Sequence, residues 1–286
     1  MGLDERVFTR TDDDVQLRRV VRVVREDIVR MLAAAGSGHS AGPLGMAEQL
    51  TALYFNVMRH DPANPDWPDR DLFFLSNGHV APVLYAVLAR AGYFPVAELG
   101  TLRRLGSRLQ GHPERGALPG VESTSGPLGC GLSQAAGYAH ALRNIDHVKR
   151  RFVYVTLGDG ELDEGNVWEA AMFAGKYKLG NLIALVDRNN IQIDGATEDV
   201  MPLTGLRAKW EAFDWHVLDI DGNDVRAVVD ALVLGQKVSW APTVILANTV
   251  PGRGVPFMEY DHSWHGKPPT PAQAAEALRA LAGGES

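Results

Sequence analysis

The chain has 286 residues, of which 45% are hydrophobic, so it can bury a large core in one α/β domain. Its net charge of −7 leaves no basic face set aside, which argues against nucleic acid or a membrane surface as a partner. A single cysteine, Cys130, excludes an internal disulfide and a cysteine zinc site. Together with the charged N-terminus and the lack of a long apolar run, this indicates a soluble, cytoplasmic protein.

The N-terminal part of the chain is expected to be mostly helical. Apolar residues at helical spacing predict an amphipathic helix at residues 12–35, which Gly36 ends. A turn rich in glycine and proline begins at Ser37 and leads into a second helix that continues to Val57. We then predict a proline-rich surface connection, a short strand and a helix at residues 61–71, 72–75 and 80–91.

A long loop at residues 106–131 is rich in glycine and shows little periodicity. Structured loops of this length in a compact domain usually serve a site. Beyond it we predict a helix at 132–145, a strand at 215–220, a helix at 225–236, a strand at 243–248 and a last helix at 271–281. No repeat or linker divides the chain, so we expect residues 1–286 to form one domain.

The stretch 152–194 organises the predicted fold. An apolar run that stops at the Gly-Asp-Gly turn 158–160 predicts a buried strand, and a helix and a second apolar strand at 182–186 follow. The two strands of such a βαβ unit are parallel, so Asp159 and Asn189 emerge at the same edge, where open α/β sheets bind ligands. We therefore expect a doubly wound, mostly parallel sheet with helices on both faces.

The polar residues at this edge predict a site for a metal and a phosphate. Asp159 and Asn189 offer hard oxygen ligands, which suit Mg²⁺ or Ca²⁺ better than zinc. Gly158 and Gly160 leave room for a phosphate to approach backbone N–H groups at a helix start. The acidic residues at 161–164, in the predicted first turn, would repel a bare diphosphate. A diphosphate bridged by a metal is therefore favoured.

The sequence GDGELDEGNVWEAAMFAGKYKLGNLIALVDRNN, residues 158–190, resembles the thiamine diphosphate signature of transketolases, in particular those divided between two chains. The resemblance implies the thiamine-diphosphate-binding fold and thiamine diphosphate as the cofactor. It also implies that Asp159, Asn189 and the backbone carbonyl of Ile191 bind the metal, with Gly158 and Gly160 against the diphosphate.

Four of the nine histidines stand beside glycine in predicted loops: His39, His79, His112 and His265. A lone loop histidine is more often a structural residue than a catalyst. The resemblance nevertheless implies roles for these four. His39 and His112 would hydrogen-bond hydroxyls of the sugar donor, and His79 and His265 would lie near the diphosphate and the reacting carbons.

Two further segments carry the resemblance. SGPLGCGLS, residues 125–133, is similar to the family's loop that passes the thiazolium and the diphosphate, and it implies contacts from Gly126 and Leu128. Glu164 matches an acidic residue that in the family lies at the subunit interface, near the catalytic glutamate. The alternative for Glu164 is an ordinary acidic residue at a helix start.

Three positions depart from the family's usual pattern. Ser40-Ala41 replaces a common Pro-Gly pair, Cys130 stands where a polar residue is frequent, and Asn190 stands where lysine or glycine often occurs. None of these changes removes a metal ligand. Because thiamine chemistry needs no thiol, Cys130 is interpreted as a packing residue, although its place near the thiazolium would allow a different donor preference.

The resemblance covers nearly all of this chain but only the first part of a full transketolase. The pyrimidine-binding domain, with the glutamate that contacts the aminopyrimidine, is expected to be absent and to be supplied by a partner chain in an α₂β₂ assembly. The reaction implied is transfer of a two-carbon ketol unit from a ketose to an aldose. The alternatives are a subunit of a 2-oxoacid dehydrogenase and a non-catalytic partner that binds thiamine diphosphate. A phosphotransferase is disfavoured because the sequence has no P-loop.

Overall fold

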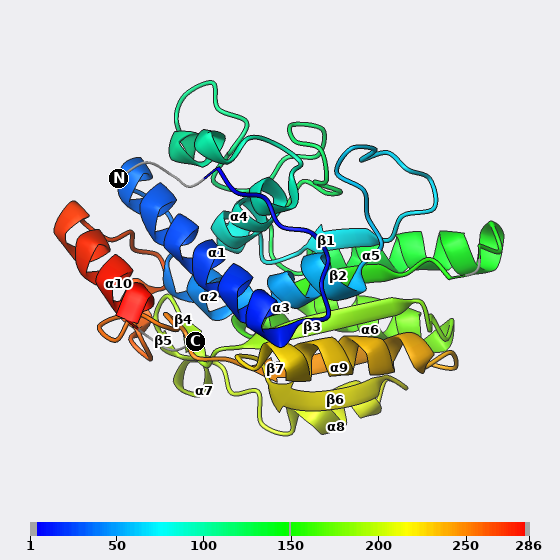
Figure 1. Ribbon diagram of the computed structural model, residues 1–286. Coiled ribbons are helices and arrows are strands. Elements are labelled where there is room, and N and C mark those ends of the chain that lie inside the picture. Colours follow the sequence, from blue (N-terminus) through cyan, green and yellow to red (C-terminus); the bar gives the residue numbers. More distant parts are fainter. Residues whose placement is uncertain (1–4, 149, 284–286) are drawn as a thin grey trace.

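A five-stranded parallel sheet forms the centre of the fold. The structure is a computed structural model that describes residues 5–148 and 150–283. The order across the sheet is β1-β2-β3-β7-β6, and every neighbouring pair is parallel (Figure 1). The strands are β1 Leu72–Leu75, β2 Val153–Gly158, β3 Leu182–Arg188, β6 His216–Asp221 and β7 Thr243–Asn248.

Helices cover both faces of this sheet. Successive side chains of a strand enter two different apolar cores, because alternate residues point to opposite faces. In β1, for example, Phe73 and Leu75 join one core, while Leu72 and Phe74 join the other. The first core also holds α1 Asp14–Ala35, α2 Ala41–Gly45, α3 Ala47–Ala52, α4 Ala81–Ala91, α9 Val225–Lys237 and α10 Pro271–Gly283. The second holds α5 Cys130–His140, α6 Gly165–Lys176 and α8 Leu206–Glu211.

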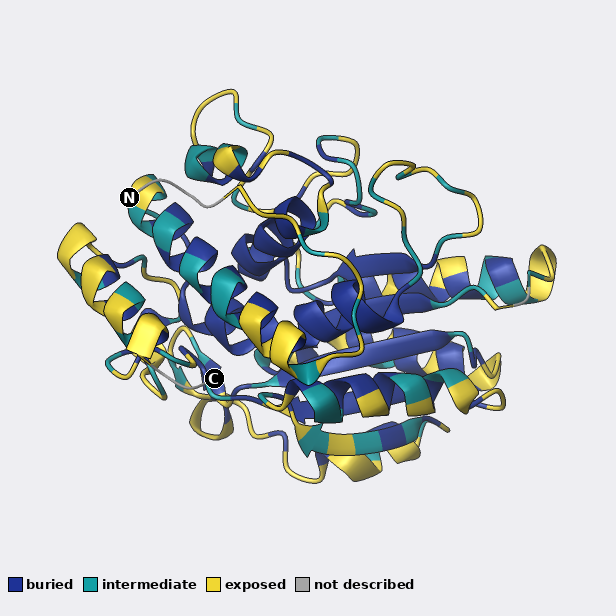
Figure 2. Cartoon of the chain, in the orientation of Figure 1, coloured by how far each residue is buried: buried dark blue, intermediate teal, exposed yellow. Residues whose placement is uncertain are grey.

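Burial follows this layered arrangement. The strands β1, β2, β3 and β7 and the helix α4 are buried almost throughout, whereas the edge strand β6 is largely intermediate or exposed and α1 and α10 each expose one side (Figure 2). α10 packs against α1, so the last helix of the chain lies beside the first (Figure 1). None of the helices in the described part of the chain is long and apolar enough to cross a membrane.

Short elements complete the chain, and most of them were not predicted. They are π-helical turns at Leu53–Val57 and Ala141–Ile145, 3₁₀ turns at Gly78–Val80, Val96–Thr101, Gly160–Asp163 and His262–Trp264, the hairpin strands β4 Ile191–Gln192 and β5 Gly195–Ala196, and α7 Thr197–Val200. The single helix predicted to continue to Val57 is divided into α2, α3 and a π-helical turn.

The helix predicted directly after the 158–160 turn begins later than expected. A 3₁₀ turn occupies Gly160–Asp163, and α6 starts only at Gly165. Glu161 explains this difference, because its carboxylate turns inward and accepts hydrogen bonds from the N–H groups of Gly129 and Gly158. The three acidic residues predicted in the first turn of this helix, Glu161, Asp163 and Glu164, all lie before α6, so that prediction was wrong.

Candidate functional site

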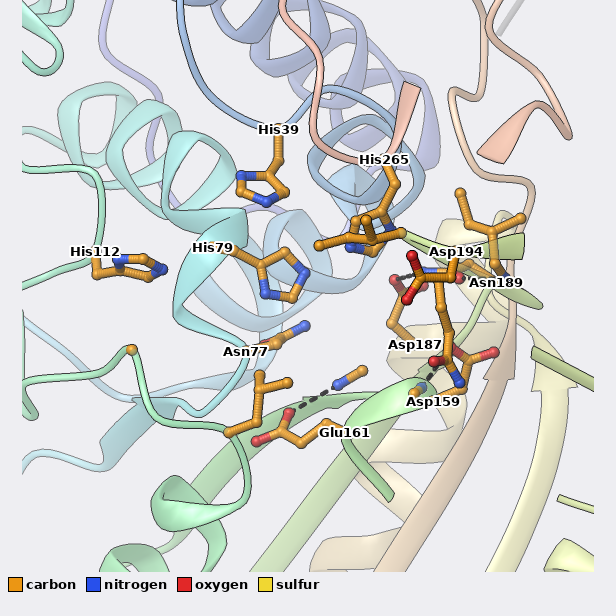
Figure 3. A pocket seen from close by; sticks show the side chains of 17 residues that line it. His39, Asn77, His79, His112, Asp159, Glu161, Asp187, Asn189, Asp194 and His265 are labelled. Atoms are coloured by element: carbon orange, nitrogen blue, oxygen red, sulfur yellow. Dashed lines mark hydrogen bonds between the residues drawn. The ribbon is translucent and has the colours of Figure 1, made fainter. Parts of the chain in front are cut away.

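A cavity of about 440 Å³ lies at the carboxyl ends of β1, β2 and β3 (Figure 3). It is the edge at which the parallel strands were expected to present their polar residues. The cavity is lined by almost all of the predicted site residues, namely His39, His79, His112, Gly126, Leu128, Gly158, Asp159, Gly160, Asn189, Ile191 and His265. Glu164 is the exception, since it is exposed before the start of α6 and does not line the cavity.

The strand register brings Asp159 and Asn189 together. Gly158 at the end of β2 pairs with Asp187 near the end of β3, and the N–H group of Asp159 donates to the carbonyl of Asp187 at 3.1 Å. The chain then turns at Asn190, whose φ of 62° lies in the left-handed region that asparagine tolerates better than most residues. This turn aims the N–H group of Asn190 at the carboxylate of Asp159, 2.7 Å away.

The two oxygens of Asp159 are held differently. Oδ2 accepts hydrogen bonds from the N–H group of Asn190, from Arg188 Nη1 at 2.9 Å and from Thr197 Oγ1 at 3.3 Å. Among the described residues, Oδ1 accepts only from the N–H group of Gly160, at 2.8 Å. Burial raises the pKa of Asp159, and the hydrogen bonds and Arg188 oppose that shift. Oδ1 therefore keeps a lone pair for a cation in a carboxylate whose orientation is fixed.

The amide of Asn189 is fixed as well. Its Nδ2 donates to Asp187 Oδ2 at 2.6 Å, and its Oδ1 accepts from the N–H group of Ile191 at 3.0 Å. Asp187 is itself held by Thr249 Oγ1, and burial raises the pKa of Asp187 to about 7. The amide oxygen of Asn189 is thus oriented before any ligand binds.

These donors fit a hard divalent cation. In the described residues no three His, Cys, Asp or Glu side chains gather closely enough to hold a metal. The cavity lining instead offers one carboxylate, Asp159, and one amide oxygen, Asn189, with Ile191, whose carbonyl is the third predicted ligand, beside them; such oxygen ligands suit Mg²⁺ or Ca²⁺. Both ions complete their coordination with water and phosphate oxygens.

The charge of the cavity also requires a cation if a diphosphate is to bind. Four acidic residues line it, Asp159, Glu161, Asp187 and Asp194, and its described lining includes no lysine or arginine. A bare diphosphate would meet a site of its own sign, whereas a divalent ion between the two reverses the local field. The donor set and the lining charge therefore support the same conclusion, a diphosphate held through a metal.

The N–H groups of the two glycines in the 158–160 turn already have partners within the chain. The N–H group of Gly158 already donates to Glu161 Oε2 at 3.0 Å, and that of Gly160 donates to Asp159 Oδ1. The approach of a phosphate to backbone N–H groups at this turn, for which the two glycines leave room, stays a prediction. A Cβ atom at Gly160 would lie 2.9 Å from the side chain of Gln192, so the turn is closely covered.

Three of the predicted histidines form a cluster. The ring centroids of His39 and His79 are 4.9 Å apart, and that of His265 lies 5.7 Å from His39 and 5.3 Å from His79. Figure 3 shows these rings opposite Asp159, Asp187 and Asn189.

The environment keeps these histidines neutral. Burial lowers the pKa of His39 to about 4 and that of His79 to about 3, and it also lowers the pKa of His265. Nδ1 of His39 and Nδ1 of His265 are buried with no partner among the described residues. A neutral imidazole donates from one nitrogen and accepts at the other, so His39 and His265 each have hydrogen-bonding capacity that no described residue uses.

The pH dependence of stability should reveal the neutral state of His79. Its pKa is below the unfolded value of 6.5, so between these values the unfolded chain binds more protons and stability falls as the pH falls. From pH 7.5 to pH 5 His79 should account for a loss of about 2 kcal/mol. Urea unfolding at both pH values, with wild type and His79→Gln, measures this. The variant should show a smaller drop, and an equal drop would contradict the assignment.

Several lining residues were missed from the sequence. Asn77, Asp187 and Asp194 line the cavity beside the predicted set. A signal for Asn77 was present, because it follows the apolar run of β1 as Asp159 follows that of β2. Cys130 is half-buried, and Asn166 Nδ2 lies 3.7 Å from its Sγ, but it does not line the cavity.

Comparison with known proteins decides the family. The family model described as "Transketolase, thiamine diphosphate binding domain" matches residues 15–284. The chain belongs to the transketolase family. It is 43% identical over 249 residues to a 6-deoxy-6-sulfo-D-fructose transketolase subunit of a Clostridium species, covering 87% of this chain and 90% of that relative. It is 41% identical over 267 residues to an apulose-4-phosphate transketolase subunit of Actinobacillus succinogenes, covering 93% of this chain and 96% of that relative.

Solved transketolases share the fold. The transketolase of Pichia stipitis superposes with a TM-score of 0.88 at 35% identity, over 93% of this chain and 40% of that one. The enzyme of Campylobacter jejuni gives a TM-score of 0.87 at 34% identity, over 93% of this chain and 43% of that one. The chain thus spans less than half the length of these transketolases. These comparisons confirm the predicted family, the fold class and the assignment as an N-terminal transketolase subunit.

Proposed function

We propose that the chain is the diphosphate-binding subunit of a two-chain transketolase that transfers a two-carbon ketol unit from a ketose phosphate to an aldose. The observation that carries this proposal is one cavity in which oxygen donors at the edge of a parallel sheet face a cluster of neutral histidines. Thiamine diphosphate, when bound, supplies the nucleophilic carbon and the electron sink for cleaving a bond beside a carbonyl.

The residues of the sheet edge would hold the cofactor. Asp159 and Asn189 present oxygens whose orientation is fixed by Arg188, Asp187 and backbone N–H groups. With the carbonyl of Ile191 they would bind Mg²⁺ or Ca²⁺ and, through it, the diphosphate. Gly126 and Leu128 lie on the wall formed by the long loop, where they would contact the cofactor.

The histidines would orient the sugar. Because burial keeps His39 and His79 neutral, each is able to donate one hydrogen bond and accept another. His39 and His112 would bind donor hydroxyls, and His79 and His265 would lie near the diphosphate and the reacting carbons.

A partner chain would complete the site. The two similar proteins described as transketolase subunits are matched over 90% and 96% of their lengths. The solved transketolases are more than twice as long as the part that this chain matches. We therefore propose that residues 1–286 form a single cofactor-binding domain, with a helical N-terminal segment and a C-terminal loop and helix. The pyrimidine-binding domain would belong to a partner in an α₂β₂ complex, with exposed Glu164 near the interface.

Two other functions remain as outcomes of the test. A 2-oxoacid dehydrogenase subunit would release CO₂ from pyruvate or a branched oxoacid, and a non-catalytic partner would bind the cofactor without turnover. The cluster of His39, His79 and His265 favours a substrate with many hydroxyls.

The reducing cytoplasm is the proposed location, in keeping with the single cysteine, which has no second cysteine to pair with.

The assay is ketol transfer from xylulose 5-phosphate to ribose 5-phosphate, with Mg²⁺ and thiamine diphosphate, using the complex that co-purifies with the tagged chain. Pyruvate and a branched oxoacid are tested in parallel for CO₂ release. We expect a seven-carbon ketose product and no CO₂. CO₂ release without ketol transfer would replace this proposal with the oxoacid alternative, and a complex that binds cofactor but turns over none of these substrates would count against the proposed substrate class.

A further inference from the structure

Glu161 is a buried carboxylate that joins three separate segments of the chain. Its side chain lies at the cavity, and the residue is only 2% exposed. Oε1 accepts hydrogen bonds from Ser76 Oγ and from the N–H group of Gly129, which is 2.6 Å away. Oε2 accepts from the N–H group of Gly158 at 3.0 Å. These donors come from the end of β1, the start of α5 and the end of β2.

Ser76 extends this network to the first turn of α5. Its hydroxyl donates to Glu161 and accepts from the N–H group of Gly131 at 3.0 Å. The residue before α5, Gly129, has no side chain to cap the helix. Glu161 and Ser76 therefore satisfy N–H groups at the helix start, where a negative charge is favourable. The contact is close, since a Cβ at Gly131 would lie 2.6 Å from the Cα of Ser76.

Two of the three segments that Glu161 joins, those of Gly129 and Gly158, lead into the two glycine-rich walls of the cavity. Gly126 and Leu128, which line it, come directly before Gly129. Asp159 and Gly160, which also line it, come directly after Gly158. A shift of the Glu161 carboxylate would therefore change the distance between the loop wall and the turn that carries the proposed metal ligand Asp159.

The chemistry of Glu161 excludes some other roles. Oε1 accepts two hydrogen bonds and Oε2 accepts one, so three of the four acceptor positions of this carboxylate serve the chain itself, which favours a structural role over proton transfer to a substrate. A carboxylate suits the three donors because both oxygens accept, and hydrogen bonds to an ionised acceptor are stronger than those between neutral groups. Glutamine has the same shape but only one accepting oxygen. Its NH₂ group would therefore face one of the backbone N–H groups, and two donors cannot form a hydrogen bond.

We propose that Glu161 is a positioning residue for the cofactor: it clamps the 126–129 loop to the 158–160 turn and so sets the width of the diphosphate site. The identity of the ligand in this inference rests on the proposed function. The clamp itself is a property of the chain and is testable without the ligand.

The test compares Glu161→Gln with Glu169→Gln, a matched control at an exposed position of α6. Thiamine diphosphate is titrated calorimetrically into the full chain at fixed MgCl₂. Hydrogen exchange is followed at the amides of Gly129 and Gly158. Glu161→Gln should exchange faster at both amides and bind the cofactor about tenfold to a hundredfold more weakly, and the control should match wild type.

Ser76→Ala supplies a second variant in case Glu161→Gln folds poorly. It removes one donor to Glu161 and the acceptor of the Gly131 N–H group, but it leaves the two backbone donors of Glu161 in place, so binding should weaken by less, about threefold to tenfold. In the complex, Glu161→Gln should raise the cofactor concentration needed for half-maximal rate while the rate at saturation and the KM for the sugar change little. A general loss of folded protein would instead lower the rate at saturation.

The outcomes separate this inference from the proposed function. Faster exchange with unchanged cofactor affinity would overturn the positioning role, and unchanged exchange in Glu161→Gln would overturn the clamp. Failure of the wild-type chain to bind thiamine diphosphate, both alone and in the co-purified complex, would count against the proposed function, and the exchange measurement would still decide whether the clamp exists. If Glu161→Gln binds the cofactor more weakly and the wild-type complex shows no ketol transfer, the result would support the clamp and contradict the sugar substrate.

Discussion

Replacing Asp159 with alanine is expected to weaken thiamine diphosphate binding by more than about a hundredfold and to make the remaining binding independent of Mg²⁺. Replacing a residue that only supports a metal ligand typically costs about 10- to 100-fold in metal affinity, so loss of a ligand should cost more. Asp159 is also the only carboxylate of the proposed ligand set, and its Oδ1 has a single donor in this structure. The measurement is calorimetric titration of wild type and variant, with and without MgCl₂.

Because of Arg188, the Mg²⁺ dependence of cofactor binding should distinguish the variant from wild type more clearly than the affinity alone. In wild type its guanidinium pairs with Asp159 and with Glu198. Without Asp159 it keeps only the second partner, and a phosphate is a ready substitute for the lost carboxylate. Residual binding of the variant should therefore resist EDTA, while EDTA removes binding in wild type.

Asp199→Ala is the matched control for Asp159→Ala. Asp199 lies in α7, near the same edge of the sheet, but it is exposed and does not line the cavity. The affinity of the Asp199→Ala variant for the cofactor should equal that of wild type. Unchanged, Mg²⁺-dependent binding in Asp159→Ala would contradict the whole assignment of the metal site.

The sequence contained enough information to locate this edge of the sheet. Apolar runs that become β2 and β3 stop at polar residues, and parallel pairing then brings Asp159 and Asn189 to the same edge. This reasoning uses only local pattern and a general rule of topology, so it needed no knowledge of distant contacts.

Glu161 shows what such reasoning leaves out. Its position after a Gly-Asp-Gly turn is typical of an acid in the first turn of a helix. Its actual partners are separated from it by 85 residues for Ser76 and 32 residues for Gly129. No local pattern reports those contacts, and they determine both the inward turn of the carboxylate and the late start of α6.

The histidines illustrate an intermediate case. Glycine neighbours marked His39, His79 and His265 as loop residues, and the resemblance to transketolases selected them from nine. Their mutual approach and the burial that keeps them neutral arise only when segments far apart in the chain pack together. Their individual roles with the sugar stay a prediction.

The second large effect is expected from the partner chain. Ketol transfer by the isolated chain should be lower than that of the complex by about 10²- to 10⁴-fold, the range that one positioned acid or base contributes. In the family, the glutamate that contacts the aminopyrimidine belongs to the pyrimidine-binding domain. The described residues that line the cavity of this chain are proposed to hold the diphosphate and the sugar, and Glu161, the only glutamate among them, is held by hydrogen bonds from Ser76, Gly129 and Gly158.

The measurement compares initial rates with xylulose 5-phosphate and ribose 5-phosphate for the tagged chain alone, for the co-purified complex and for the complex after the partner is separated and added back. Restoration on adding the partner would exclude damage to this chain as the cause of low activity. Full activity of the isolated chain would mean that it needs no external glutamate, and it would overturn the proposed division of the active site between two chains. The Asp159→Ala chain, combined with the same partner, should stay inactive, because a partner that supplies the glutamate does not replace the metal ligand.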